Sequence, residues 1–560
     1  MTARGFISAN PQPIDRHKKQ GTIMPRRQAL GSLQQNTPYD LLVIGGGATG
    51  CGIALDAASR GLKTVLIEKN DFAEGTSSRS TKLVHGGVRY LEMAVKRLDS
   101  VQYHLVKDGL HERGVLLRNA PHLARRIPLV TPLYKWLEVP YIFAGLKLYD
   151  LLAGKQGIGH SRIVGRKEAL QRFPMLKAKG LKAGVLYYDG QFNDARMAVS
   201  LAVTAQKYGA AIFNHLEVLS LVKEADRICG ARVRDNIDGE EFVLHAKGVI
   251  NATGPFADRI RRMDDPDAEP ILEASSGIHI VLDKRFAPPE TGLMIPKTED
   301  GRVLFILPWQ GQALVGTTDE PAEISDHPRP TQEEIAYLLR HISRYFNLQV
   351  TEQDIKSTWA GLRPLVFDAK AADTAHLARD HIIQISAAGL LTIAGGKWTT
   401  YRKMAEDAVD HAIMEFSLER EHPCRTVHLP LVGAENFDPE GAATLVRDYN
   451  LPPDIAIHLH QTYGDRAPLV AQLAGEGFAN RLHPDHPCIE AEVIYALRHE
   501  CAERAGDILV RRTTLALLDN AAALAAAPRV IELMAEERGW SNERRSIETE
   551  LLTLRLTEAV

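Results

Sequence analysis

Cysteine is scarce in this sequence, and nothing in it points to a cysteine framework. The 560 residues include five cysteines, an odd number, and no two of them form a CxxC pair. A disulfide scaffold or a structural zinc site needs cysteines at clustered spacings. We therefore expect a reducing cytosolic environment and no metal site. The cysteines are scattered along the chain at Cys51, Cys229, Cys424, Cys488 and Cys501.

Long apolar runs and a strong net charge are missing too. No run reaches the roughly 18–20 apolar residues that a membrane span needs, and we expect no signal peptide before the fold. The net charge of −3 gives no indication of nucleic acid as a partner. Because single cores stop growing at roughly 250–300 residues, a chain of 560 residues predicts two or three domains.

The first 38 residues have neither a helical nor a strand period. They are polar and include several basic residues, among them Arg26 and Arg27. We expect a disordered tail over residues 1–38, and a basic targeting leader is the alternative.

The first chemical motif lies in residues 39–52, which read YDLLVIGGGATGCG. An apolar run predicts a buried parallel strand, and Gly45, Gly47 and Gly50 then supply GxGxxG before a predicted helix. The first glycine permits a tight turn, the second lets a pyrophosphate approach the backbone, and the third lets helix and strand pack closely. The helix N-terminus supplies N–H donors for phosphate.

A second predicted strand gives this motif its context. TVLIEK, at residues 64–69, places Glu68 about 20 residues after the first glycine, the spacing of a carboxylate that binds the ribose hydroxyls. A full strand–helix–strand unit of this kind predicts a bound dinucleotide.

Two later segments repeat the order strand, glycine turn, helix. GVINATGPFAD, at residues 248–258, contains Gly254, and LLTIAGGKWTTYRKMAEDAV follows at residues 390–409. One nucleotide fold assembled from such distant pieces, with β-rich insertions between them, favours FAD over NAD. The second segment supplies Gly395, Gly396, Lys397 and Thr399 as further cofactor-binding candidates.

The fold class is therefore α/β with an interleaved second domain. We expect a Rossmann-like FAD-binding domain over residues 39–425, interrupted by an antiparallel-sheet substrate domain mainly at 111–184 and 261–354. Residues 490–518 show apolar residues at i, i+3 and i+4, which predicts a helical C-terminal domain over 426–560.

Four stretches in combination resemble the FAD-dependent glycerol-3-phosphate dehydrogenases, from about residue 38 to near residue 520. They are VIGGGATGCGIALDAASRG, SSRSTKLVHGGVRYLE, GLRPL and AGGKWTTYRKMAE. The resemblance implies an FAD-binding domain of the glutathione-reductase or D-amino-acid-oxidase type with noncovalent FAD. It also implies oxidation of sn-glycerol 3-phosphate to dihydroxyacetone phosphate, with electrons passed to a membrane quinone.

Such a reaction needs cations for the phosphate. Lys82, His85 and Arg89 gather around the Gly86–Gly87 pair, as in the wall of a pocket for an anion. The resemblance places Arg89 and Arg363 on the substrate, where a planar guanidinium binds phosphate bidentately; a structural ion pair is the alternative for each. Tyr90 would donate a hydrogen bond or pack on the flavin.

The proton acceptor has two candidates, His85 and His279. A histidine near its ordinary pKa of ~6.5 suits proton removal at neutral pH. His279 lies in an alternating strand and His85 in the HGG turn, so a structural role is open for each. The resemblance places both in the pocket without deciding between them.

The turn at residues 395–400 has two candidate roles. A helix that begins near Thr399 can direct N–H groups at the flavin edge where negative charge collects on reduction. Lys397 adds a full charge, aimed at flavin or substrate phosphate. We expect Arg402 and Lys403, on the next turn, to lie at the surface.

Residues 127–153 are unusually apolar, and prolines and single lysines interrupt them. They predict an amphipathic helix in a membrane interface, with buried core as the alternative. Because the family that the chain resembles passes electrons to a membrane quinone, we expect peripheral binding to the inner face of the cell membrane. The sequence leaves three rival functions: an oxygen-using glycerol-3-phosphate oxidase, another FAD-dependent alcohol or amine oxidoreductase, and a flavin-binding scaffold. It also leaves the oligomeric state open, a homodimer included.

Overall fold

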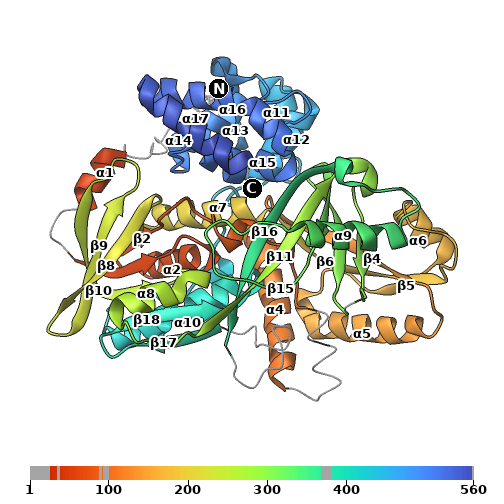
Figure 1. The fold of residues 1–560 in the computed structure, drawn as a ribbon, viewed down its shortest axis with the longest axis horizontal. Coiled ribbons are helices and arrows are strands. Elements are labelled where there is room, and N and C mark those ends of the chain that lie inside the picture. The colour runs from red at the N-terminus through yellow and green to blue at the C-terminus, as the bar shows by residue number, and fades with distance from the viewer. Residues whose placement is uncertain are drawn as a thin grey trace, which may run out of the picture.

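The computed structural model describes residues 26–33, 38–87, 91, 100–299, 301–367 and 381–557. These residues form two β-sheets that lie next to each other, with the C-terminal helices over one edge of both (Figure 1).

The first sheet carries the predicted nucleotide fold. Its strand order is β17-β18-β10-β1-β2-β7, and β18, β10, β1, β2 and β7 run parallel. A hairpin of β8 and β9 continues from β10. The strands are β1 (Tyr39–Ile44), β2 (Thr64–Ile67), β7 (Ala211–Phe213), β8 (Leu216–Glu224), β9 (Arg227–Asp235), β10 (Glu241–Asn251), β17 (His381–Ile385) and β18 (Leu390–Gly395).

Strand β1 is apolar because both of its faces are covered. Leu41 and Val43 pack with the helices α2 (Ala48–Ser59), α7 (Asp194–Lys207) and α10 (Tyr401–Glu415). Leu42 and Ile44 point to the other face and pack with the β8–β9 hairpin and α8 (Ala257–Asp264). A parallel strand buried on both sides reads as a continuous apolar run, and for that reason the sequence reveals it.

The second sheet is mostly antiparallel, in the order β15-β11-β14-β13-β12-β4-β6-β3, with β16 beside β11 and β5 beside β6. It takes in three strands that lie wholly or mostly outside the predicted substrate segments 111–184 and 261–354, namely β3, β6 and β16. Its strands are β3 (Leu83–Val84), β4 (Ala124–Leu133), β5 (Arg162–Gly165), β6 (Ala183–Phe192), β11 (Leu272–Leu282), β12 (Gly292–Ile295), β13 (Leu304–Trp309), β14 (Gln312–Gly316), β15 (Glu320–Pro321) and β16 (Ile355–Val366).

The expected disordered tail contains a helix, so that expectation is wrong for α1 (Arg26–Leu33). Leu30 and Leu33 are buried against the first sheet. Arg26 forms an ion pair of 2.9 Å with Asp235 at the end of β9. Eight residues are too short to show a clear apolar period, so the contacts with the sheet, and not the local pattern, fix this helix.

The described residues after 426 are helical, as the sequence predicts. Their helices surround a shared apolar core that continues into the second sheet. They are α11 (Gly441–Tyr449), α12 (Pro453–Tyr463), α13 (Ala467–Leu473), α14 (Glu490–His499), the π-helical segment η11 (Asp507–Arg512), α15 (Leu515–Leu518), α16 (Asn520–Arg538) and α17 (Asn542–Thr557).

The apolar segment 127–153 divides into two parts. Residues 127–133 belong to β4, whose Ile127 and Leu129 are core, so the interfacial prediction is wrong for them. The remainder contains α5 (Glu138–Ala153), next to which Trp136 and Leu137 are 65% and 90% exposed. No helix among the described residues has the length and apolar character needed to cross a membrane.

Candidate active site

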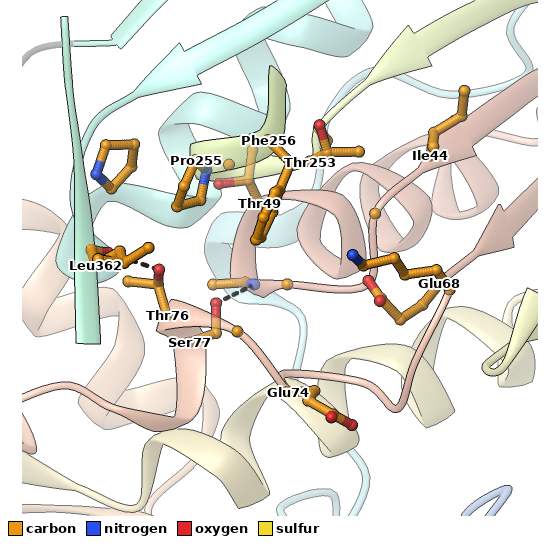
Figure 2. A pocket seen from close by; sticks show the side chains of 18 of the residues that line it. Ile44, Thr49, Glu68, Glu74, Thr76, Ser77, Thr253, Pro255, Phe256 and Leu362 are labelled. Atoms are coloured by element: carbon orange, nitrogen blue, oxygen red, sulfur yellow. Dashed lines mark hydrogen bonds between the residues drawn. The ribbon is translucent and has the colours of Figure 1, made fainter. Parts of the chain in front are cut away.

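A cleft opens at the carboxyl ends of the parallel strands of the first sheet, where ligands bind in folds of this type (Figure 2). The segments that follow β1, β2, β10 and β18 all contribute to its wall. Among the predicted cofactor residues, those that line the cleft are Gly45, Gly47, Glu68, Gly254, Gly395, Gly396 and Lys397.

The three motif glycines have different surroundings. Gly45 has φ +108°, and a Cβ there would lie 2.6 Å from the carbonyl O of Ala252. A Cβ at Gly50 would lie 1.8 Å from the carbonyl O of Gly45, so Gly50 serves the packing of α2 on β1 and does not line the cleft. A Cβ at Gly47 would approach only Ser77 Oγ, at 3.1 Å. Gly47 is therefore the motif glycine whose missing side chain leaves room for a ligand.

Glu68 and Ser77 fix the main chain around this space. The N–H of Gly46 donates to Glu68 Oε2 (2.7 Å), and the N–H of Asn70 donates to Glu68 Oε1 (2.9 Å). Burial raises the pKa of Glu68. Ser77 Oγ accepts a hydrogen bond from Ala48 N–H (2.9 Å) at the start of α2. Together these groups form the donor and acceptor set of a dinucleotide site: a carboxylate for the ribose, and an open glycine with a helix N-terminus for the pyrophosphate.

The turn after β18 joins the cofactor cleft to the HGG segment. Gly395 and Gly396 both have φ +80°, and a Cβ at Gly396 would lie 2.4 Å from Met404 Sδ. Thr399 is buried, and its Oγ1 accepts a hydrogen bond from the N–H of His85 (3.2 Å). The structure therefore brings His85 to the turn that contains Lys397 and Thr399, more than 300 residues away in sequence.

His279 and Arg363 lie on one face of the second sheet, beside the cleft. Strands β11 and β16 pair Ser275 with Arg363 and His279 with Trp359. Between them Gly277 leaves space for the guanidinium of Arg363, because a Cβ at Gly277 would lie 2.2 Å from Arg363 Nη2.

Several oxygens orient the Arg363 guanidinium. Its Nη1 donates to Asp319 Oδ1 (3.2 Å), and its Nη2 donates to Thr317 Oγ1 (3.1 Å) and to the carbonyl O of Thr318 (2.9 Å). The neighbouring residues Leu362 and Pro364 line the cofactor cleft. Arg363 thus has a carboxylate partner, and its two sequence neighbours border the cleft, whereas its own side chain is not among those that line it.

His279 is buried and neutral. Its Nε2 lies 3.0 Å from Thr81 Oγ1, and its ring stacks on Trp359 with centroids 4.2 Å apart. Burial lowers its pKa well below 6.5, and the charges of Lys82 and Arg363 lower it further. Its Nδ1 is buried without a hydrogen-bond partner among the described residues. A neutral imidazole with an unused ring nitrogen has the protonation state of a proton acceptor, but its pKa lies below the ordinary value that the sequence analysis expected, which makes it a weaker base.

The positive charge of Lys82 is paired within the protein and is not offered to an anionic ligand, contrary to the prediction from the HGG stretch. Its Nζ lies 2.6 Å from Asp194 Oδ1, donates to the carbonyl O of Ser78 (2.6 Å) and sits over the rings of Trp309 and Trp359. Both charged side chains of the pair are fully buried. The capping segment of α7 supplies this carboxylate from a distant part of the chain, so the local sequence could not show the pair.

Arg79 is a cleft residue that the sequence analysis missed. Its side chain lines the cleft and is 6% exposed. Burial lowers its pKa to about 10, assisted by the charges of Arg555 and Arg511. The described part of the chain provides no hydrogen bond or ion pair to its guanidinium. A buried guanidinium without a partner is suited to an anionic ligand.

The predictions for Arg89 and Tyr90 are not tested, and the prediction for Arg402 is wrong. Arg89 and Tyr90 lie outside the described residues. Arg402, expected at the surface, is buried, because its guanidinium pairs with Glu112 at 2.7 Å.

Comparison with known proteins agrees with this cleft. The family described as "FAD dependent oxidoreductase" matches residues 40–402, and the "C-terminal domain of alpha-glycerophosphate oxidase" matches residues 424–545. The mitochondrial glycerol-3-phosphate dehydrogenase of Mus musculus is 47% identical over 99% of this chain and 77% of its own length. The human enzyme is 48% identical over 94% of this chain and 74% of its own length.

A solved structure extends the likeness to the fold. The glycerol-3-phosphate dehydrogenase of Bacillus halodurans, complexed with FAD, superposes with a TM-score of 0.78 at 30% identity and covers 95% of this chain and 97% of its own. The cofactor of the cleft is FAD. The chain belongs to the FAD-dependent glycerol-3-phosphate dehydrogenase family.

Proposed function

We propose that this protein oxidises sn-glycerol 3-phosphate to dihydroxyacetone phosphate. The observation that carries this proposal is that a neutral histidine, His279, and a guanidinium, Arg363, lie on one face of the strand pair β11–β16, whose residues Leu362 and Pro364 line the FAD cleft. FAD, when bound, accepts the hydride from C2 of the substrate. Family membership supports the choice of substrate.

The two side chains have separate tasks. Arg363 binds the substrate phosphate, with Asp319 and Thr317 holding its guanidinium in orientation. His279, which is unprotonated at neutral pH, takes the hydroxyl proton, and its lowered pKa makes it a weaker base than an ordinary imidazole. His85 is the alternative base, and its place beside Thr399 keeps it near the flavin-binding turn. Arg89, Tyr90 and Lys397 complete the proposed substrate contacts, as the family resemblance implies.

Anaerobic titration of the holoenzyme tests the proposal. We expect sn-glycerol 3-phosphate to bleach the flavin absorbance, and glycerol and a panel of other hydroxy and amino acids to leave it unchanged. Bleaching by an unphosphorylated alcohol or an amine would favour another oxidoreductase of this fold. No bleaching by any substrate would leave a flavin-binding scaffold.

We further propose that electrons leave the flavin for a membrane quinone. The exposed apolar side chains at and before α5, which include Trp136, Leu137 and Tyr141, would insert into the lipid interface. The same helix contacts the HGG turn, because Gly86 N–H donates to the hydroxyl O of Tyr149 (2.7 Å). Rapid peroxide formation in air would instead favour the oxygen-using oxidase.

The proposed location follows from this surface. The curated relatives are named as mitochondrial proteins. For this chain we propose peripheral binding to the inner face of the cell membrane through α5 and the residues just before it. Flotation with phospholipid liposomes measures that binding when the wild type is compared with the variants described below.

A further inference from the structure

The segment from Glu68 to Ser77 connects the two ends of the cofactor cleft. Glu68 and Ser77 fix the main chain at the proposed ribose and pyrophosphate positions. Between them the loop turns toward the C-terminal domain and presents two carboxylates, Asp71 and Glu74. The position of this loop therefore determines whether both ends fit FAD at once.

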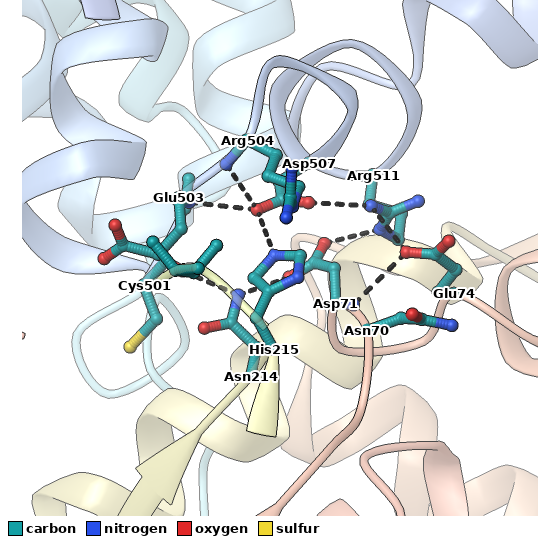
Figure 3. A network of polar contacts seen from close by, with 12 residues as sticks. Asn70, Asp71, Glu74, Asn214, His215, Cys501, Glu503, Arg504, Asp507 and Arg511 are labelled. Carbon is teal, nitrogen blue, oxygen red and sulfur yellow. Dashed lines mark hydrogen bonds and ion pairs between the residues drawn. The ribbon is translucent and has the colours of Figure 1, made fainter. Parts of the chain in front are cut away.

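Arginines of the C-terminal domain bind Asp71. Arg512 holds the carboxylate bidentately, with Nη1 2.7 Å from Oδ2 and Nη2 3.0 Å from Oδ1. Arg511 Nε lies 2.5 Å from Oδ2, and Asn214 donates to Oδ1 (2.9 Å). The charged side chains are at most 1% exposed. Figure 3 shows Arg511 and Asp507 on the C-terminal side of this contact, facing Asp71 and Glu74.

A π-helical turn brings two consecutive arginines to one carboxylate. Neighbouring residues of an α-helix do not share a face. Arg511 and Arg512 lie in η11, a π-helical segment, and Thr513 N–H closes the wide turn on the carbonyl O of Ile508 (2.9 Å). Segments of this kind occur frequently at functional sites. The helix geometry is thus matched to holding Asp71.

The second carboxylate of the loop is held in the same way. Burial alone would raise the pKa of Glu74, but Arg555 and Arg511 lower it well below its usual range. Arg555 Nη1 lies 2.5 Å from Glu74 Oε1, and Arg511 Nη2 lies 3.2 Å from Glu74 Oε2. Asp507 balances the arginine charge, since its Oδ1 accepts from Arg511 (3.0 Å) and its Oδ2 contacts His215 (2.9 Å).

We propose that the C-terminal helical domain holds the Glu68–Ser77 loop in its FAD-binding position, and that Arg511, Arg512 and Arg555 are positioning residues for the cofactor. A buried ion pair contributes little net stability compared with apolar packing. The ion pairs made by these arginines matter here for geometry, because they fix a loop that has FAD-site residues at both ends. The domain would therefore act on a cofactor that none of these three arginines touches directly.

FAD release from the holoenzyme tests this proposal. Flavin fluorescence rises when FAD leaves the protein. The rate of this rise after the holoenzyme is diluted gives the rate constant for FAD dissociation. We expect Arg512→Met to raise this rate by about tenfold or more, and Arg555→Met, whose side chain is more exposed, to raise it a few-fold. At the same excess of FAD, both variants should gain less in melting temperature than the wild type, because ligand stabilisation falls as the dissociation constant rises.

Arg196→Met is the matched control. Arg196, on α7, makes two buried hydrogen bonds of 2.6 Å to Glu500 at the entrance to the C-terminal helices, but it does not touch the cofactor loop. Glu500 also accepts a hydrogen bond from Arg512 at its carbonyl O (2.8 Å), so Arg196→Met removes a neighbouring ion pair and keeps the Arg512–Asp71 contact itself. We expect it to lower the melting temperature without changing the FAD release rate. Equal release rates in Arg196→Met and Arg512→Met, or wild-type rates in all variants, would overturn the proposal.

The FAD-release experiment stays interpretable if one variant fails to fold, and it does not depend on the substrate. If Arg512→Met does not fold, the milder Arg555→Met provides the comparison with Arg196→Met. Because no step involves the substrate, the outcome is independent of whether glycerol 3-phosphate reduces the flavin.

Discussion

The turns of the cofactor cleft depend on main chain and glycines, whereas the candidate substrate residues, His279 and Arg363, act through their side chains. Gly45, Gly47 and Gly396 shape the cleft because they have no side chain. Each of them lies in a short contiguous segment that forms a turn. His279 and Arg363 meet because two strands pair in one register. The cleft should therefore respond to added volume, and the pocket to changes in charge and hydrogen bonding.

The largest effect is expected at Gly47. A Cβ there meets only Ser77 Oγ, at 3.1 Å, so Gly47→Val should fold and yet occupy the space of the pyrophosphate. We expect a protein with native circular dichroism that purifies without FAD. Gly50→Val is the contrast, because its side chain would collide with the backbone of Gly45 and should prevent folding. Normal flavin content in Gly47→Val would contradict the assignment of this glycine to the cofactor.

The contiguous parts of the molecule could be predicted from the sequence. The motif glycines and the proposed ribose acid Glu68 belong to one contiguous strand–helix–strand unit, whose local pattern carries the information. The fold class followed from the same kind of signal, because β1 and β2 are buried on both faces and flanked by glycine turns.

The remaining features depend on tertiary contacts. The local sequence did not reveal the pairing of Lys82 with Asp194 or the burial of Arg402, since each partner lies more than 100 residues away. Arg79 had no distinguishing neighbour in sequence, and only its position in the cleft indicates an anion-binding role. Apolar composition alone could not separate strand β4 from the exposed residues that follow it.

The second prediction concerns the side-chain pocket. His279→Gln keeps a polar side chain of similar reach but cannot accept the proton at an imidazole nitrogen. We expect kcat to fall about 100- to 10,000-fold, the range for loss of a general base, with flavin content unchanged. Thr81→Val, which removes only the contact with His279 Nε2, should cause a smaller loss. A near-normal kcat in His279→Gln would transfer the role to His85, to be tested by His85→Gln.

The third prediction separates phosphate binding from support of the fold. Arg363→Lys keeps the charge and loses the planar fork, which should cost about 2–3 kcal/mol of transition-state stabilisation, or roughly 30- to 150-fold in kcat/KM. The loss should be much smaller with unphosphorylated glycerol, a poor substrate of both proteins. Equal losses with the two substrates would mean that Arg363 and Asp319 form a structural pair.

The smallest effect is expected far from both sites, at the exposed apolar surface next to α5. Trp136 and Leu137 are largely solvent-exposed, so replacing both with glutamate should leave folding and FAD binding intact. Phe143 is unsuitable for this test because it packs against the core. Each lost apolar contact with lipid is worth roughly 1–2 kcal/mol, and the variant should move from liposomes to the soluble fraction.

Turnover distinguishes this surface from the cleft and the pocket. With a soluble dye as acceptor the rate of the double variant should match the wild type, because the flavin site is unchanged. With a quinone in liposomes it should fall several-fold. Met414→Glu, an equally exposed apolar position on α10, is the control and should change neither rate. Loss of dye-linked turnover or of FAD in the double variant would show that these side chains support the fold, since an interfacial surface can be charged without disturbing a hydride transfer that takes place elsewhere.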